Sequence, residues 1–490
     1  MNTLTLRSKL SDRGRQKFFV AFLSGKLLGL ALAFLAIKSL APWVIAHTAS
    51  AAGLSPQAGE TIDQVVSATN TSWVLIAAFL VFFMQAGFMM LEAGFARTRE
   101  VVNILQECIV DTCLCAILFW AFGFAFMFGY GNGVIGHEFF FLNHATATYT
   151  YHGSFDTGVA FMAFFLFQFA FADTCSTITS GAMVGRTGFK GDLLYSVGVS
   201  GFIYPIIGHW VWGPGGWLQT VRNGVHMWDF AGSSVVHTMG GFIALAGAIV
   251  LGPRLGRKFK RDGGGLPPGH DLTVAAIGGV ILWFGWYGFN PGSTLSSMDA
   301  AGIGRVATNT TLAAAAAGLT AMLWVYPRVK KWDMGITING FLGGLVAITC
   351  PCYWVNATGA VIIGAIAGPI VVLGIDFIEH LRIDDPIGAV AVHGFAGIWG
   401  TWSLGLFSTG TFGVPKGLLW GGDADQFIAQ VWGNAVVAVA SFGVAYILMR
   451  AVKLTGTLRV SEEGELEGID IHEHGSPAYH PEAAYMGKGI

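Results

Sequence analysis

Charged side chains are scarce in this 490-residue sequence, at 11% of residues against the ~25% that is usual in soluble domains. Such a chain has too little charge to cover a water-soluble globule of its size. Its hydrophobic content of 53% is instead typical of a membrane protein. Basic patches and base-stacking motifs are missing as well, so the sequence gives no indication of a nucleic-acid partner.

Cysteine is also rare, and the six thiols lie in or beside apolar runs, where we expect them to pack as small core residues. The pair in Cys350-Pro-Cys352 is weak support for a metal site, because no histidine lies beside it. We therefore expect neither a metal centre nor a cofactor. Since the sequence has no assembled catalytic triad or nucleotide motif, we do not expect an enzyme. The thiols are Cys108, Cys113, Cys115, Cys175, Cys350 and Cys352.

Glycine, by contrast, is abundant at 69 residues, which suits closely packed membrane helices. Eleven apolar segments each approach the ~20 residues needed to cross a bilayer. The sequence thus predicts an all-α polytopic membrane protein, although Gln85, Glu92 and Asp111 interrupt the first two segments. The expected spans are residues 72–95, 104–130, 157–183, 193–212, 229–252, 272–290, 307–327, 335–352, 357–380, 386–408 and 426–451.

Basic residues are unevenly distributed between the connecting loops. The loops after the odd-numbered segments contain fifteen Lys and Arg residues, and the alternate loops contain only Arg222, Arg305 and Lys416. Because basic loops tend to stay in the cytoplasm, this pattern predicts an outside N-terminus and a cytoplasmic tail, residues 452–490. We expect a multi-pass protein of the plasma (inner) membrane.

The first 51 residues have the features of a secretory signal. Five basic residues between Arg7 and Lys17 precede the apolar run Leu27–Ile37, and Ala49-Ser50-Ala51 offers a cleavage site. We predict that residues 1–51 are a cleaved signal peptide, with an uncleaved signal-anchor as the alternative. The membrane domain then covers residues 52–451.

One thirteen-residue motif, D-x-x-G-x-x-x-V-H-x-x-x-G, occurs twice. The copies begin at Asp229 and Asp385 and contain His237 and His393. Each histidine follows its acid by eight residues, or about 12 Å along a helix. In the predicted orientation the copies enter the membrane from opposite sides. Residues 72–252 and 272–408 are therefore expected to be inverted repeats, followed by a final helix at 426–451.

Histidines inside a bilayer are costly and often mark a permeation path. Two neutral imidazoles in an apolar tunnel offer hydrogen bonds to a small neutral molecule and disfavour ions. A metal site is the alternative, but two histidines without a nearby cysteine or carboxylate are an incomplete ligand set. Asp229 and Asp385 either belong to the path or only cap their helices.

Aromatic residues lie near the predicted outer ends of the same segments. They include Phe167, Phe171, Trp210 and Trp212, and the stretch Gly288-Phe289-Asn290-Pro291-Gly292-Ser293 ends another segment. Aromatic faces beside a hydroxyl group suit a small cation. The alternative is ordinary packing or an interfacial belt, because the sequence contains 38 Phe and 16 Trp residues.

Together these motifs resemble the ammonium transporter (Amt/Mep/Rh) family, and its bacterial Amt type in particular. The resemblance covers about residues 65–455, and it implies a homotrimer of eleven-helix subunits with one pore each. It is carried by DFAG at 229–232 through His237, GFNPGS at 288–293, DPIGAVAVHGFAGIWG at 385–400, HWVWG at 209–213 and FQFAFA at 167–172.

The resemblance implies that ammonium is recruited at an outer aromatic site, loses a proton, and crosses a hydrophobic pore as ammonia. Potassium cannot follow, because it has no proton to lose. The implied recruitment site is Trp212, Phe171, Ser293 and Asp229, the implied gate is Phe171 and Phe289, and the implied pore histidines are His237 and His393.

The tail resembles the family's regulatory C-terminal region, which in relatives couples to a PII-type protein. Ser476-Pro477 stands where an acidic residue is common, which leaves a PII partner open. Gly185 also replaces a commonly acidic residue, with an expected effect on loop structure.

Two other functions stay open. An ammonium sensor would have the same fold and little or no flux, although 39 tail residues are fewer than a fused signalling domain needs. A channel for neutral ammonia or carbon dioxide is disfavoured by the combination of Trp212 with Ser293.

Overall fold

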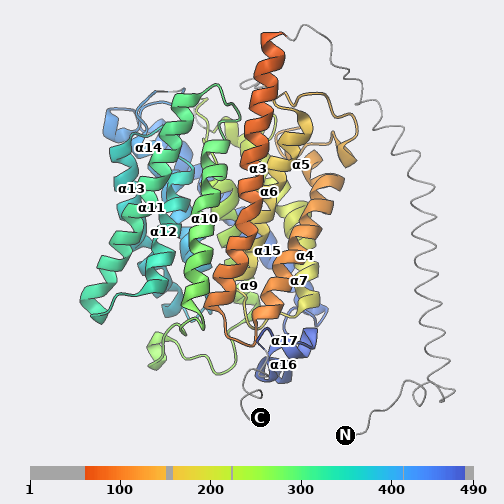
Figure 1. Ribbon diagram of the computed structural model, residues 1–490, viewed down its shortest axis with the longest axis vertical. Coiled ribbons are helices and arrows are strands. Elements are labelled where there is room, and N and C mark those ends of the chain that lie inside the picture. The colour runs from red at the N-terminus through yellow and green to blue at the C-terminus, as the bar shows by residue number, and fades with distance from the viewer. Residues whose placement is uncertain (1–60, 151–157, 222–223, 412, 480–490) are drawn as a thin grey trace, which may run out of the picture. The chain divides into compact units, whose positions relative to one another are not determined.

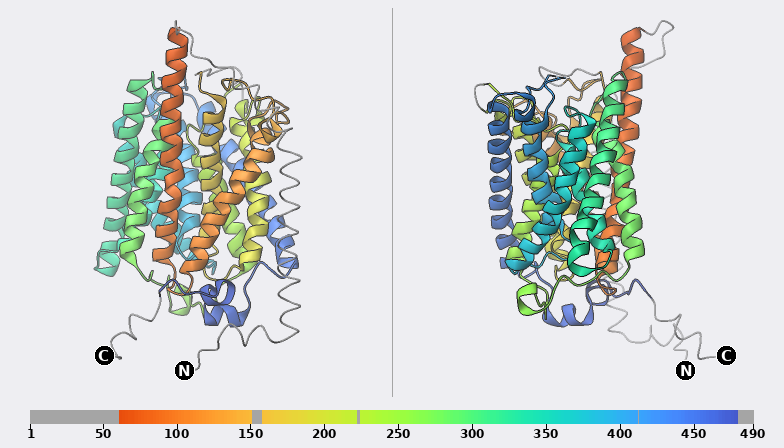
Figure 2. Two further views of the ribbon diagram at one scale, coloured as in Figure 1. Left: turned by 45° about the vertical axis from the view of Figure 1, so that its right-hand side comes forward. Right: turned by 90° about the vertical axis from the view of Figure 1, so that its left-hand side faces the viewer.

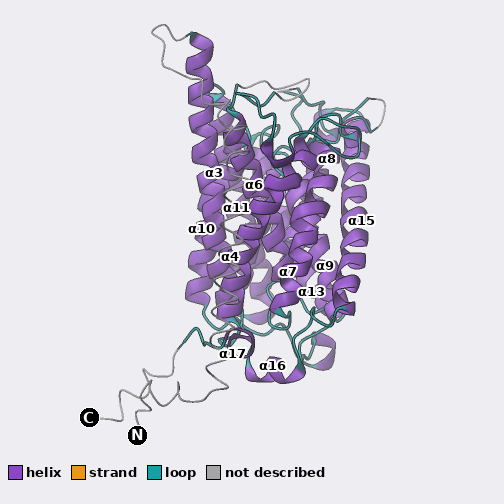
Figure 3. Ribbon diagram, turned by 90° about the vertical axis from the view of Figure 1, so that its right-hand side faces the viewer, coloured by secondary structure: helices purple, strands orange, loops and turns teal. Residues whose placement is uncertain are grey.

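The computed structural model describes residues 61–150, 158–221, 224–411 and 413–479, and the predicted signal segment 1–51 lies outside them. Within these ranges every regular element is a helix, and the only extended pairings are isolated β-bridges. The helices stand side by side in Figure 3. The all-α prediction is therefore confirmed for the described part of the chain.

Ten helical stretches of the described chain are long and apolar enough to span a membrane, which confirms a multi-pass membrane protein. The first five are α3 (Ile62–Phe95), α4 with η2 and α5 (Val101–Leu118, Phe119–Gly123, Phe124–Phe128), α6 (Phe161–Gly181), α7 with η4 and α8 (Phe189–Gly198, Val199–Ile203, Tyr204–Trp212), and η6 with α9 (Ser233–Thr238, Met239–Leu251). The others are α10 (Leu272–Gly292), α11 (Ala300–Val329), α13 (Ala357–His380), η8 with α14 (Val390–Phe395, Ala396–Phe407) and α15 (Asp425–Leu454).

The eighth expected segment is shorter than the others. Its helix, α12 (Met334–Thr349), has 16 residues and so extends for only about 24 Å. Pro351 follows closely and cannot donate the hydrogen bond that a continuing helix needs. The described chain has ten full-length spans plus this shorter helix, and the predicted count of eleven membrane helices stays a prediction.

Polar caps fix where several helices begin. Thr61 and Gln64 form a capping box, so α3 begins ten residues before the predicted start at residue 72. Carboxylate or amide oxygens accept backbone N–H bonds at four more helix starts. These N-caps are Asp271 of α10, Asp299 of α11, Asp333 of α12 and Asn356 of α13.

Small residues let the spans approach closely. A Cβ atom added to Gly94 of α3 would lie 2.4 Å from the backbone nitrogen of Ala275 in α10, and one on Gly278 would lie 2.4 Å from that of Leu91. Two short helices, α16 (Glu462–Glu467) and α17 (Ile469–His474), lie at one end of the spans (Figure 2). We call this the tail end and the other the opposite end.

Candidate permeation pathway

Each copy of the duplicated motif forms a π-helical turn, η6 in the first copy and η8 in the second. The motif glycine before each turn has a left-handed backbone, with φ of 114° at Gly232 and 80° at Gly388. Glycine adopts this conformation without steric cost. Because π-helical turns widen the helix and occur often at functional sites, both copies are candidate site elements.

The motif acids cap these turns. Asp229 accepts hydrogen bonds of 2.8–2.9 Å from the backbone N–H groups of Gly232, Ser234 and Val235. Asp385 accepts two such bonds, at 3.0 and 2.8 Å, from the start of its own turn. A buried carboxylate that satisfies free N–H groups fixes the direction in which each turn leaves the preceding loop.

The two motif histidines are in direct contact. Nδ1 of His237 lies 3.1 Å from Nδ1 of His393, and the rings are stacked at 5.2 Å with 21° between their planes. One Nδ1–H therefore donates to the other ring's Nδ1, which requires that ring to be neutral. Both side chains are buried, and Nε2 of His237 has no hydrogen-bond partner within the described residues.

The last glycine of each motif copy holds the histidines together. A Cβ on Gly241 would lie 2.3 Å from the nitrogen of Gly394, and one on Gly397 would lie 2.6 Å from the carbonyl oxygen of Ser233. Each helix therefore crosses the other copy's π-helical turn at backbone contact, which only glycine permits.

Aromatic rings continue from the histidine pair in an unbroken series. His237 stacks on Phe289 and on Trp286, with ring centroids 5.5 and 5.2 Å apart. Phe289 stacks on Phe171 at 4.0 Å, and Phe171 meets the edge of Trp212 at 6.0 Å. Residues from η6, α6, α8 and α10 are thus brought into one row.

Polar groups lie at the end of this row, where Trp212 and Ser293 are half-buried. Nε1 of Trp212 donates to the backbone oxygen of Asp229 at 2.7 Å. The Ser293 hydroxyl donates to the carbonyl oxygen of Phe289 at 2.8 Å, so Ser293 lies one helical turn from that ring. The structure thereby brings together all of the sequence-predicted residues for recruitment, gate and pore. Trp210 is not among them, because its indole bonds Val134 on an exposed loop.

Trp286 is a member of this row that the sequence analysis missed. Its buried indole nitrogen donates to the hydroxyl of Thr349 at 2.8 Å, which holds the ring flat against His237. Its position three residues before Phe289 puts both on one face of α10. Because the chain contains so many aromatic residues, this three-residue spacing alone does not distinguish a pathway ring from a packing ring.

A cavity of ≈ 20 Å³, enough for about one water molecule, lies on the other side of the histidine pair. It is lined mainly by apolar side chains, and Glu92 and Asn339 supply polar groups beside His393. The cavity is lined by residues of α3, α6, α12 and the η8 turn, at the tail-end side of the histidines. It extends the row of rings in the direction of the tail.

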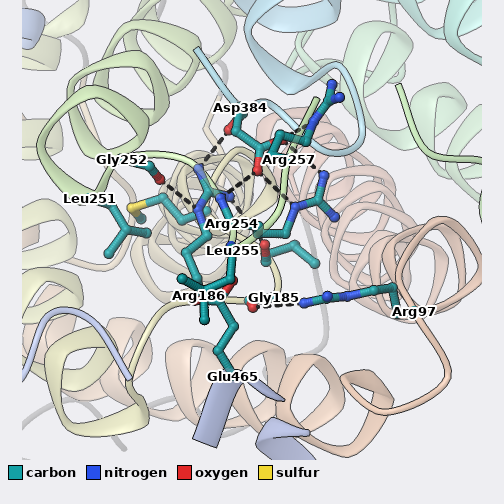
Figure 4. A network of polar contacts seen from close by, with 12 residues as sticks. Arg97, Gly185, Arg186, Leu251, Gly252, Arg254, Leu255, Arg257, Asp384 and Glu465 are labelled. Carbon is teal, nitrogen blue, oxygen red and sulfur yellow. Dashed lines mark hydrogen bonds and ion pairs between the residues drawn. The ribbon is translucent and has the colours of Figure 1, made fainter. Parts of the chain in front are cut away.

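A buried ionic network fixes the start of η8 (Figure 4). The Asp384 carboxylate accepts bonds from Arg254 at 2.8 and 2.9 Å and from Arg257 at 3.1 Å, and its backbone oxygen accepts from Arg186 at 2.6 Å. Burial alone would raise the pKa of Asp384, but the bonds and charges of Arg254 and Arg186 hold that pKa well below its usual range. Burial lowers the pKa of Arg186 to about 10.

The described part of the chain has no group of three or more His, Cys, Asp or Glu side chains placed to hold a metal ion. Cys350 and Cys352 are free and buried, and their Sγ atoms lie near backbone oxygens of Trp228 and Thr349. The chemistry of the row is therefore that of aromatic faces, imidazoles and one hydroxyl group.

Comparisons with known proteins agree with this geometry. The profile of the Ammonium Transporter Family matches residues 72–479. Ammonium transporter Amt2 of Archaeoglobus fulgidus is 43% identical over 446 residues, which cover 87% of this chain and 92% of the relative. A putative ammonium transporter of Synechocystis is 41% identical over 87% of this chain and 92% of its own length.

Solved structures give the same result. A structure described as a sensor Amt protein superimposes with a TM-score of 0.76 and 36% identity, and covers 84% of this chain and 100% of its own. Mep2 of Candida albicans superimposes with a TM-score of 0.74 and 28% identity, over 82% of this chain and 89% of its own. This multi-pass membrane protein therefore belongs to the ammonium transporter family.

Proposed function

We propose that the protein transports ammonium across the membrane, and that the nitrogen crosses the histidine pair as neutral ammonia. Family membership supports the substrate class. The observation that carries the mechanism is the unbroken row of rings from Trp212 through Phe171 and Phe289 to His237 and His393.

Recruitment is assigned to the half-buried mouth of the row. The faces of Trp212 and Phe171 attract a small cation by cation–π interaction. Ser293 uses its proton on Phe289, so the lone pairs of its hydroxyl oxygen are free to accept an N–H of ammonium. Asp229 acts on the site through its neighbours, because its backbone oxygen orients Trp212 and its carboxylate caps η6.

Selectivity follows from the closed stack beneath the mouth. The rings of Phe171 and Phe289 lie 4.0 Å apart, which leaves no room for a hydrated ion. A bare cation that entered would lose its hydration without replacement, whereas ammonia loses far less. Beyond the rings, the buried Nε2 of His237 offers ammonia a hydrogen-bond partner. Potassium has no deprotonated form and is rejected.

The surrounding architecture is part of the proposal. We assign residues 72–252 and 272–408 to inverted repeats in an eleven-helix subunit, with the tail end in the cytoplasm and three subunits in a homotrimer. The course of the two motif copies supports inversion. The first begins beside Thr349 and runs to Leu251 next to Arg459 of the tail, whereas the second begins at the tail end beside Asp384.

Two further assignments, at the two ends of the chain, complete the proposal. Residues 1–51 are proposed as a signal peptide, and residues 452–490 as a regulatory tail that a PII-type protein reads. Both rest on sequence pattern and family resemblance.

An ammonium sensor is the second candidate. The similarity to a structure described as a sensor Amt protein, at 36% identity, favours it. A sensor would bind ammonium at the same mouth and pass little or no nitrogen. Flux measurements therefore separate the two functions.

The test uses the purified full chain in proteoliposomes, with ammonium and then potassium pulses, and records both current and uptake of labelled methylammonium. We expect ammonium-dependent uptake and no potassium current. His237→Asp and His393→Glu place an ionisable acid in the pore and should change the cation selectivity. His137→Glu, on an exposed loop, serves as the control.

Binding of ammonium without uptake or current would favour the sensor and reject the transport proposal. Wild-type selectivity in both pore variants would reject the assignment of the histidines.

A further inference from the structure

The loop that follows Ser293 is held in a strained conformation. Ser293 lies at the end of α10, and residues 294–299 connect it to α11. Within this loop Leu295 has a left-handed backbone, with φ of 51°. A leucine in that conformation is strained, because its Cβ lies too close to the following carbonyl oxygen. Such strain persists only where surrounding contacts hold the chain in place.

Asn70 of α3 supplies contacts of this kind. Its side chain is 2% exposed, and its amide oxygen accepts a hydrogen bond from the Ser296 hydroxyl at 3.2 Å. The same oxygen accepts the hydroxyl and the backbone N–H of Ser297, at 3.0 and 2.9 Å. One buried amide therefore fixes the loop immediately after its strained residue.

Trp73 holds the loop at a second point, one turn further along α3. Its Nε1 donates to the hydroxyl of Thr294 at 3.1 Å, and that hydroxyl donates to a carbonyl oxygen in the last turn of α10 at 2.8 Å. Thr294 is the neighbour of Ser293 in the chain, so its position constrains the backbone of Ser293. We call the contacts of Asn70 and Trp73 with residues 294–297 the loop clamp.

The helix that carries the loop clamp also packs tightly against α10 (Figure 1). A Cβ atom on Gly292 would lie 2.4 Å from the Cβ of Ala77, and one on Gly288 would lie 2.5 Å from the carbonyl oxygen of Ala77. At such close approach the two helices have little room to shift against each other. Ser293 thus follows a firmly supported helix end, and the loop clamp secures the chain on its other side.

The orientation of Ser293 matters because its hydroxyl proton is already used. That proton is donated to the carbonyl oxygen of Phe289 at 2.8 Å, so the direction of the oxygen lone pairs depends on where the end of α10 lies. Hydrogen bonds weaken steeply away from their best geometry. A released loop would let the last turn of α10 fray, and Ser293 would spend less time in the orientation that accepts an N–H of ammonium.

We propose that Asn70 and Trp73 are positioning residues for ammonium recruitment: the loop clamp orients Ser293 and so sets the affinity of the site. This inference rests on the proposed transport function. Neither side chain has to touch the cation. Their effect should fall on KM, the substrate concentration that gives half the maximal rate, and not on the maximal rate, because the clamp leaves the rings and histidines of the pathway in place.

The test measures initial uptake of labelled methylammonium by proteoliposomes over a range of concentrations. In Asn70→Ala the loop donors lose their acceptor. We expect KM to rise by about threefold to tenfold, as part of a hydrogen bond to a cation is lost, with a maximal rate within about twofold of the wild type. Thr69→Ala is the matched control and should keep the wild-type KM, because its exposed hydroxyl bonds the backbone of its own helix.

A double-mutant cycle separates positioning from a general effect on folding. If Asn70 acts through Ser293, then Asn70→Ala should raise KM in the wild type and leave KM unchanged in a Ser293→Ala background. Equal increases in the two backgrounds would overturn the proposal. A lower maximal rate with the wild-type KM would also overturn it, because loss of folded protein alone gives that result.

Two milder variants cover the case in which N70A does not fold. Asn70→Asp keeps an acceptor for the same loop donors and should hold KM within about twofold of the wild type. Trp73→Phe keeps a ring and removes only the Nε1 donor, so KM should rise, but by less than in N70A. A wild-type KM in folded W73F, or a KM in folded N70D as high as in N70A, would contradict the loop clamp.

Binding measurements distinguish a failure of the loop clamp from a failure of transport. Isothermal titration calorimetry of the purified full chain with methylammonium gives the dissociation constant without any flux. If the wild type bound methylammonium but took up none, the proposed transport would fail, and the N70A and T69A dissociation constants would still test the clamp. Equal dissociation constants for the wild type, N70A and T69A would overturn the inference.

Discussion

At the scale of single residues, the glycine that ends each motif copy sets how closely the histidines approach. Gly241→Ala would place a Cβ 2.3 Å from the backbone of Gly394, so the two helices must move apart. We expect a loss of about 1–3 kcal/mol in the free energy of unfolding, together with reduced methylammonium uptake. Thermal unfolding of the detergent-solubilised protein measures the first effect.

Gly304→Ala provides the control for this substitution. Gly304 lies on α11, and a Cβ atom there would have no heavy atom within 4 Å. Alanine at this position should leave the free energy of unfolding unchanged or raise it by up to about 1 kcal/mol. Equal melting temperatures for G241A and G304A would contradict the crossing role of Gly241.

Gly185 explains a departure from the family pattern that the sequence left open. Its φ is +83°, and a Cβ atom there would lie 2.5 Å from Oε1 of Glu100. In this chain the Glu100 carboxyl group occupies the space that a side chain at position 185 would need. The sequence could not reveal that Glu100 fills the space beside Gly185, because the two residues are 85 positions apart and share no motif.

At the scale of helices and loops, Asp384 joins the loop after α9 to the start of η8. Its folded-state pKa lies below the ordinary value, so its ionised form stabilises the fold above the ordinary carboxyl pKa of ~3.9. This contribution is lost as the pH falls from there towards the folded-state pKa. Asp384→Asn should lower the free energy of unfolding by about 3 kcal/mol at pH 7.

The difference between Asp384→Asn and the wild type should shrink as the pH is lowered below ~4, which thermal unfolding at two pH values measures. Asp262→Asn, in an exposed pair with Arg382, should cost less than about 1 kcal/mol at either pH. A D384N deficit that grew on acidification would reverse the assigned sign.

Long apolar runs made the membrane spans predictable, since twenty such residues have few alternatives to a bilayer. Helix ends were less predictable, because caps such as Thr61 lie outside the apolar runs. All residues of the ring row except Trp286 were predicted from their motifs and from the family resemblance. No sequence pattern indicated the Asp384 network, because its partners come from loops that are as far as 198 residues apart in the chain.

At the scale of the whole chain, the tail binds the spans through Glu465. This buried carboxylate accepts the backbone N–H of Leu255 at 2.6 Å and a bond from Arg459 at 2.7 Å. Arg459 in turn donates to the carbonyl oxygen of Leu251 at the end of α9. The tail is therefore fixed to the end of α9, the helix that follows the η6 turn.

Glu465→Gln should loosen the tail, because an amide lacks the charge that Arg459 pairs with. We expect faster protease cleavage between α15 and α17 and faster hydrogen exchange in α16. Glu467→Gln lies on the same short helix but is half exposed, and should behave as the wild type. Identical cleavage rates for the two variants would show that Glu465 does not secure the tail.

The crossing at Gly241 and Gly397 has a consequence for how this protein can change. Each glycine packs against the backbone of the other motif copy. The residue that one half tolerates at the crossing therefore depends on the backbone of the other half. A hybrid that joins the first half of this chain to a relative's second half would have a crossing whose two sides come from different proteins. Such halves are exchangeable only as matched pairs, and substitutions at this crossing in one half should track those in the other.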